Sequence, residues 1–287
     1  MQKALTRWVA EHAQRSNTSA LLAEAISIDG KELRSAKHGV NQRVHLLSAC
    51  THDTGTILGQ VDVNAKTNEI SRLPELLEDL SEQYDLTGRT ITLDALHTQR
   101  DTAKLITHTY QAHYVFTLKG NQPTLHAQVK DLPWKQVPVT DTTIDTSHGR
   151  LVIRKLQLAT VKERMLPAWP GLKQVGRITR ERIRNGVTST EVVYVLTSLP
   201  SFLAGPAYLA DAIRGHWSVE NKVHWVRDVT FNEDKNQVRT GFAPRNLAAL
   251  TNAVLTAFRM IGVKNIAETA SELHASHRLI RQVLEAV

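Results

Sequence analysis

Three acidic residues, two aspartates and one glutamate, are the first candidates for chemistry because each adjoins a hydrophobic segment. Asp29 follows the apolar run of "AISIDG" and Asp94 that of "TITLDA", so both are expected at strand ends. Functional groups in α/β proteins gather where strands end. Two carboxylates that lie close together repel each other unless a cation joins them, and Mg²⁺ or Mn²⁺ prefers such oxygen ligands. Asp29–Gly30 is also a common turn dipeptide, so a turn-forming role stays open.

The stretch "IRGHWSVENKVHWVRDVTF", residues 213–231, surrounds Glu220 with polar and aromatic side chains. It has no Gly or Pro beyond its third residue, and its apolar residues recur at helical spacing, so it is predicted to be a helix. His216, Trp217 and His224 lie three or four residues from Glu220 and share its face. A separate apolar edge is expected to pack on a sheet: Val219, Val223 and Val226.

Two histidines and a glutamate on one helix face could instead bind zinc. The zinc-protease signature places its two histidines four residues apart, with a glutamate beside the first. His216 and His224 are eight positions apart, so this stretch does not match that signature. Structural histidines are the simpler interpretation, and Glu220 is then a candidate third carboxylate beside Asp29 and Asp94.

The elements that must position these carboxylates follow from the apolar periodicity. Three hydrophobic segments with short connections between residues 24 and 63 predict antiparallel strands, with a turn at Asp53–Gly55. A helix over 67–84, a strand ending at Asp94, a helix over 99–113 and a fifth strand from residue 114 follow. The buried stripe of the first helix is Ile70, Leu73, Leu76, Leu77 and Leu80. The order β-β-β-α-β-α-β is typical of a mixed sheet covered by helices.

The composition changes after the fifth strand. Residues 133–200 are rich in Val, Ile and Thr, which predicts a β-rich insertion of short antiparallel strands. Helical patterns return beyond it, including 244–260 and 271–286, and residues 1–15 also have a helical pattern. The predicted organisation is a short N-terminal helical segment (1–23), the first part of a core (24–132), the insertion (133–200) and the C-terminal helices of the core (201–287).

The bulk composition is that of a basic protein, either a soluble basic enzyme or a protein that binds a polyanion. The chain has 287 residues, a net charge of +7 and a pI near 9.6. Such a charge favours nucleic acid as a partner, because phosphate neutralisation supplies most non-specific affinity. No window has the roughly 18 apolar residues of a membrane span. The N-terminus lacks the apolar block of a signal peptide and Cys50 is the single cysteine, so a cytoplasmic location is expected.

Taken together, five segments carry a resemblance to a known family: "AISIDGKELR", "ITLDALHTQ", "FTLKGNQ", "SHGR" and "IRGHWSVENKVHWVRDVTFNEDKNQVRTGFAPRNLA". In this order, from about residue 24 to 260, they resemble the DDE transposases of bacterial insertion sequences, in the ISAs-type or H-repeat-associated branch. The resemblance implies an RNase H-like fold, with the β-rich insertion between strand five and the Glu-bearing helix. It also implies an Asp-Asp-Glu triad, which matches Asp29, Asp94 and Glu220.

The resemblance further implies the reaction and the partners. The triad would hold two Mg²⁺ (or Mn²⁺) ions, which promote DNA hydrolysis and strand transfer by in-line attack on a phosphodiester. The partners would be duplex DNA at the element ends and at the target, and a second copy of the chain in the DNA complex. Trp225 is expected in the core. Candidate DNA contacts are Lys31, Arg34, Lys119, Asn121, Arg214, His216, Trp217, Asn221 and Arg227.

Two departures from the family pattern qualify this expectation. Only about 23 residues precede the first strand, whereas the branch has a further N-terminal helical segment there. Val152 also stands two residues after "HGR", where an acidic residue is usual. The alternative is therefore a truncated DNA-binding remnant that no longer transposes. A general nuclease on the same fold is a third hypothesis, which the insertion and the long Glu220 block disfavour.

Overall fold

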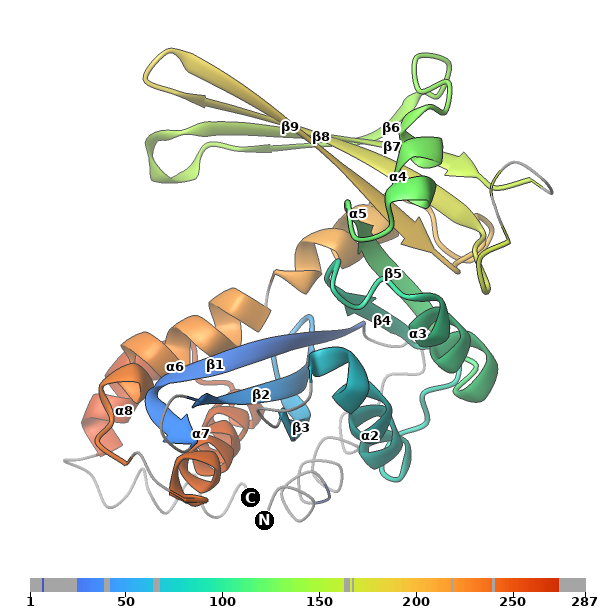
Figure 1. Cartoon of the computed structure of the whole chain (residues 1–287). Helices are drawn as coiled ribbons and strands as arrows, with labels where there is room; N and C mark the ends of the chain where they lie inside the picture. The colour runs from blue at the N-terminus through green and yellow to red at the C-terminus, as the bar shows by residue number, and fades with distance from the viewer. Residues whose placement is uncertain are drawn as a thin grey trace. The chain divides into compact units, whose positions relative to one another are not determined.

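The computed structural model describes residues 25–38, 42–63, 68–162, 168–217, 219–238 and 241–273, together with Arg7 and Leu166. The chain divides into two compact units (Figure 1). The first unit combines residues 1–86 with residues 215–287, and the second unit comprises residues 87–214. Among the described residues, none of the helices is both long enough and apolar enough to cross a membrane.

The first unit contains three antiparallel strands in the order β3-β2-β1 (Figure 1). They are β1 (Ile26–His38), β2 (Gln42–Thr51) and β3 (Ile57–Val63). The predicted turn between the second and third strands is confirmed, because Gly55 adopts φ +70° and its N–H donates to the Thr51 carbonyl. Glycine takes up this left-handed conformation at no steric cost.

Helices cover both faces of these strands. Helix α2 (Glu69–Ser81) packs on the face of Gly59, where its Leu76 and Leu80 lie closest. Side chains alternate along a strand, so Gln60 points to the opposite face, where it bonds to Asn252 of α7 (Ala243–Met260). The predicted leucine stripe of α2 is confirmed by the burial of four residues: Leu73, Leu76, Leu77 and Leu80.

Helical residues from the C-terminal part of the chain complete the first unit. They comprise the π-helix η3 (Glu220–His224), α6 (Trp225–Val229), the short η4 (Glu233–Lys235), α7 and α8 (Ile266–Leu273). The predicted valine edge is confirmed: Val219, Val223 and Val226 are buried against Cys50, Ile57 and Leu255. The predicted helix over 1–15 and most of that over 271–286 lie outside the described residues.

The second unit begins with a parallel strand pair. β4 (Thr90–Leu93) runs parallel to β5 (His113–Leu118), and the connection contains α3 (Arg100–Lys104), which continues as the π-helix η1 (Leu105–Thr109). A parallel pair needs such a crossover because its strands point the same way. Helix α4 (Pro123–Lys130), which the sequence did not predict, follows β5 and packs against the insertion through the His126–Tyr194 ring contact.

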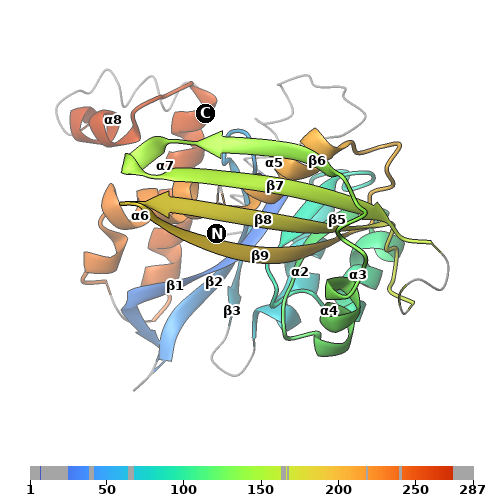
Figure 2. The same cartoon turned by 90° about the horizontal axis from the view of Figure 1, so that it is seen from above.

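The insertion forms a continuous antiparallel sheet with β5 in the order β5-β9-β8-β7-β6 (Figure 2). Its strands are β6 (Val139–Asp145), β7 (Leu151–Thr160), β8 (Gln174–Arg184) and β9 (Val187–Thr197), with the short η2 (Ser147–Gly149) between the first two. Helix α5 (Pro206–His216) follows. The predicted α/β class with a β-rich insertion is confirmed: the strands are of mixed direction, helices flank them, and the insertion follows strand five.

The prediction that strand one ends at Asp29 is wrong. β1 continues through Asp29 and Gly30 to His38, with Asp29 opposite Ser48 of β2. Gly30 does not form a turn; it makes room for a side-chain pair. A Cβ on Gly30 would collide with the Glu69 carboxylate, which forms an ion pair with His45 (Nε2–Oε1, 2.8 Å). Glycine inside a strand often marks such a close approach.

Candidate active site

Glu220 begins a π-helical turn instead of lying within a continuous helix. α5 ends at His216, Trp217 is in a turn, and the backbone N–H of Trp225 bonds to the Glu220 carbonyl, five residues back. The prediction of one helix over 213–231 is therefore wrong. The buried valines on one side of this segment hold it against the sheet. The π-helical turn changes the directions of the neighbouring side chains relative to those of a regular α-helix. Single π-helical turns occur frequently at functional sites.

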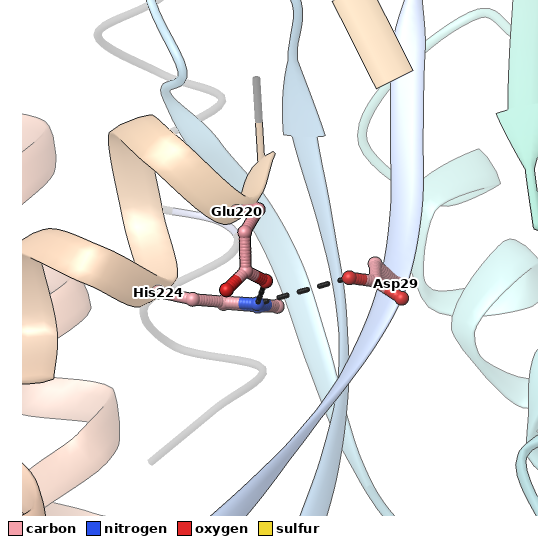
Figure 3. Close-up of side chains that lie close together, drawn as sticks. All are labelled: Asp29, Glu220 and His224. Atoms are coloured by element: carbon pink, nitrogen blue, oxygen red, sulfur yellow. Dashed lines mark hydrogen bonds and ion pairs between the residues drawn. The ribbon is translucent and has the colours of Figure 1, made fainter. Parts of the chain in front are cut away.

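Three side chains from β1 and η3 converge (Figure 3). The Nδ1 atom of His224 lies 3.2 Å from Oε2 of Glu220 and 3.7 Å from Oδ2 of Asp29. One ligand atom from each residue lies within 4.8 Å of the other two. Glu220 is 60% exposed, Asp29 28% and His224 4%, so the cluster opens to solvent on its Glu220 side.

The donor chemistry of this cluster fits a divalent cation. Two carboxylates supply the oxygen ligands that hard cations prefer, and an imidazole nitrogen is compatible with Mn²⁺ as well as with softer metals. The exposure of Glu220 leaves a route for a solvated ion and a substrate. The Nε2 atom of His224 is buried without a hydrogen-bond partner among the described residues, so the only polar contacts of the ring are through Nδ1.

His224 is the member of this cluster that was not predicted as a site residue. The signal was present, because His224 lies four residues after Glu220 and therefore on the same helical face. The role of His224 in the cluster depends on its contact with Asp29, which is far away in the sequence. Without that contact, a buried structural histidine was the better interpretation.

Asp94 lies in the second unit, directly after β4 as predicted, and is partly buried. Its Oδ1 accepts hydrogen bonds from the backbone N–H groups of Leu96 (2.9 Å) and His97 (3.4 Å). This bonding is typical of an aspartate that initiates a turn. Asp94 therefore has a local structural role whether or not it also binds a metal.

Residues 21–256 match the family model described as "Transposase DDE domain". The chain belongs to this family. It is 33% identical over 250 residues to "Putative transposase YncI" of Escherichia coli O157:H7, covering 82% of this chain and 62% of that protein. It is 34% identical over 232 residues to "H repeat-associated putative transposase YhhI" of E. coli K12, covering 77% of this chain and 60% of that protein. The resemblance drawn from the sequence motifs is thus confirmed.

The chain spans about three fifths of the length of these curated relatives (62% and 60%). Among solved structures, the piggyBac transposase synaptic complex with hairpin DNA is similar over 91% of this chain and 52% of that chain. The sequence identity is 13% and the TM-score 0.49, a likeness too weak to bear on function.

Within this DDE domain, alternate residues of β1 contact the segment that carries Glu220. Ser27 Oγ donates to the Gly215 carbonyl (3.3 Å), Asp29 faces His224, and Lys31 Nζ pairs with Oδ1 of Asp228 (2.6 Å). Side chains two apart on a strand share a face, so these contacts fix the strand and the helical segment in one register. The side chain of Lys31 is only 6% exposed, which favours this structural role over its predicted contact with DNA.

Arg227 is likewise a structural residue of the DDE domain. Its side chain is fully buried, and two guanidinium nitrogens donate to Glu233 at 2.9 and 2.7 Å. The third bonds to Asn252 at 3.2 Å and to Gln60 at 3.5 Å. The burial of Arg227 favours a structural role over its predicted contact with DNA, because its donors are directed at three residues, one each in β3, η4 and α7.

The β2–β3 turn contacts the chain on both sides of the helical break at Trp217, through hydrogen bonds on one side and through packing on the other. Lys222 Nζ donates to the carbonyls of His52 and Asp53, each at 2.7 Å, and Arg259 of α7 donates to those of Gly55 and Lys222. The His52 ring packs so closely on Gly215 that a Cβ there would collide with it. Burial, aided by the neighbouring His216 and Lys222, lowers the pKa of His52 to about 3.

The other predicted DNA contacts of the DDE domain have mixed exposure. The side chain of Arg34 lies outside the described residues, and His216 is partly buried. Trp225, which was expected in the core, is 56% exposed, so that prediction is wrong. The exposed candidates remain predicted DNA contacts: Lys119, Asn121, Arg214, Trp217 and Asn221.

Proposed function

We propose that the chain is the catalytic part of a transposase that hydrolyses phosphodiester bonds at the ends of an insertion sequence and transfers the DNA strands. Asp29, Asp94 and Glu220 are the proposed ligands of two Mg²⁺ or Mn²⁺ ions. The supporting observation is the approach of Asp29 and Glu220, from distant parts of the sequence, to within 4.8 Å in a solvent-accessible cluster. Two partly exposed carboxylates that lie this near to each other repel one another unless a cation binds between them.

The bound ions would activate a water molecule or a DNA 3′-OH as the nucleophile, and they would stabilise the departing oxygen. The chain itself positions the ligands. The Nδ1 atom of His224 lies within hydrogen-bonding distance of Oε2 of Glu220 (3.2 Å), and in the tautomer that carries the proton on Nδ1 it would donate to that carboxylate and hold it beside Asp29. Because the ring is buried, it cannot rotate out into solvent and away from Glu220. His224 is thus a proposed positioning residue, and no side chain of the cluster has to act as a nucleophile.

The remaining parts of the proposal concern partners and location. Trp217 and Asn221 are exposed near Glu220, and in this proposal they would contact the DNA that enters the cluster. Arg214, Lys119 and Asn121 are further proposed phosphate contacts, and His216 would contribute where its ring reaches the DNA. The complex would contain two copies of the chain and would act in the bacterial cytosol.

The test is a nicking and strand-transfer assay on duplexes that carry the inverted repeats flanking the gene. We expect Mn²⁺- or Mg²⁺-dependent products at the repeat ends. Asp29→Asn, Asp94→Asn and Glu220→Gln should each abolish the products while DNA binding in EDTA persists. The Glu268→Gln variant, which alters an exposed carboxylate on α8, is the matched control and should retain activity.

The outcomes separate the proposal from its competitors. Equal activity of the Asp94 variant would refute the triad assignment. Salt-sensitive DNA binding without any metal-dependent product would indicate a non-transposing remnant. Cleavage of unrelated DNA as readily as of the repeat ends would indicate a general nuclease.

A further inference from the structure

Most of the net positive charge of the chain lies in the insertion. Residues 139–197 contain ten Lys and Arg against five Asp and Glu, a net +5 of the chain's +7. β8 alone carries four arginines and one glutamate. Two of the cations expected near Glu220, Lys31 and Arg227, are instead buried in ion pairs. The basic character of the chain therefore needs an explanation in the insertion.

Strand register places arginines from neighbouring strands on one face of the insertion sheet. Thr143, Arg154, Arg180 and Glu191 are direct cross-strand partners from β6 to β9. Arg182 lies two residues along β8 from Arg180 and therefore on the same face. This face, with Arg214 of α5 and with Arg150, which immediately precedes β7, is called the arginine face below.

Helix α5 borders the arginine face and leaves a depression beside it. The depression is lined by Arg154, Ile178 and Thr143 from the sheet and by Ala210, Ile213 and Arg214 from α5. Asp141 also lines it. The lining thus combines apolar side chains with two guanidinium groups, the ammonium group of Lys155 and one carboxylate.

The arginines outnumber the carboxylates that could neutralise them. Arg180 pairs with Glu191 and Arg214 with Asp211, but like charges directly opposite each other, as in Arg154 and Arg180, are destabilising in a sheet. Burial lowers the pKa of Arg154; the charge of Asp145 opposes this shift, and Arg180, Arg214 and Arg150 add to it. The repulsion among these guanidinium groups would be relieved by a polyanion laid across them.

We propose that the arginine face binds the phosphate backbone of duplex DNA. The inference rests on the proposed action on DNA and extends it, because it assigns DNA contact to the insertion and not only to the surroundings of Glu220. Guanidinium groups match phosphate oxygens in a bidentate geometry. Such contacts position the DNA and do not read its sequence, so the face binds element ends and unrelated duplex alike.

The experiment measures binding of the full chain to a short fluorescent duplex of random sequence, in EDTA, by anisotropy. For the Arg154→Gln/Arg180→Gln variant, we expect the dependence of log K on log salt to become shallower by about two units between about 50 and 200 mM. Affinity at about 100 mM salt should fall roughly 10- to 100-fold. The matched control is Lys130→Gln/Lys135→Gln, which removes two exposed charges in and after α4 and should change both quantities little.

A second variant keeps the proposal testable if the arginine variant folds poorly. Glu191→Gln removes the carboxylate beside Arg180 and should make binding tighter and more dependent on salt, a gain that misfolding cannot produce. Equal losses in the arginine and lysine variants, or weaker binding by Glu191→Gln, would overturn the proposal. Binding in EDTA does not depend on the carboxylate triad, so failure here is distinguishable from loss of metal-dependent cleavage in the Asp29 variant.

Discussion

Replacing Arg227 by methionine separates a structural role from a DNA contact, because the two roles predict losses in different measurements. The fully buried guanidinium holds Glu233, itself 7% exposed, through two hydrogen bonds of 2.9 and 2.7 Å. Removing one partner of a buried ion pair typically costs about 3–5 kcal/mol, since the other charge is left uncompensated. Gln60 and Asn252 also lose a donor.

The assay is urea unfolding followed by circular dichroism, with DNA binding measured in parallel at a temperature where the variant is folded. Arg227→Met should lower the free energy of unfolding by about 3–5 kcal/mol, a large part of the roughly 5–15 kcal/mol available to a domain. The salt dependence of DNA binding by the folded variant should not change. Arg214→Gln, which breaks only the exposed pair with Asp211, should cost less than about 1 kcal/mol.

A double variant tests the coupling within this buried pair. Arg227→Met/Glu233→Leu removes both charges, so it should be destabilised by less than the sum of the two single variants. The reasoning is refuted if Arg227→Met costs less than about 1 kcal/mol while DNA binding becomes less dependent on salt. That result would place Arg227 on the DNA, as the sequence alone had indicated.

Three further predictions concern the surroundings of Glu220. Lys222→Met should lower the rate of metal-dependent cleavage with little change in DNA affinity, because it removes the two hydrogen bonds from the Lys222 side chain in the π-helical turn to the β2–β3 turn. Rescue by Lys222→Arg would show that these two hydrogen bonds matter, and an unchanged rate would refute the idea. His224→Ala should raise the Mn²⁺ concentration needed for half-maximal cleavage, whereas His224→Asn should raise it less; equal effects would argue against positioning of Glu220 through Nδ1. The pKa of His52 is lowered to about 3 in the folded chain, against 6.5 in the unfolded chain. As the pH falls below 6.5, the unfolded chain therefore binds a proton that the folded chain does not, and the folded state loses stability. This loss should reach about 2 kcal/mol at pH 5, and the urea midpoint of His52→Gln should not show this part of the pH dependence.

Local patterns in the sequence predicted most of the elements and singled out the candidate carboxylates. The leucine spacing of α2, the valine edge of η3 and α6, and the β-branched composition of the insertion each reflect burial of a continuous face, which adjacent residues encode directly. Asp29, Asp94 and Glu220 could be singled out because a carboxylate beside an apolar run is unusual. The family motifs added the order in which these residues belong together.

Only the tertiary structure decided which side chains face one another. Asp29 lies inside β1 and not at its end, because pairing with β2 and the space that Gly30 leaves for Glu69 carry the strand onward. A basic side chain is a solvent-exposed candidate at Lys119 and a buried partner at Arg227, and the burial of Arg227 depends on the distant Glu233 and Asn252. Sequence spacing fixes neighbours along a helix or strand, but burial and charge pairing depend on contacts between segments that no local pattern specifies.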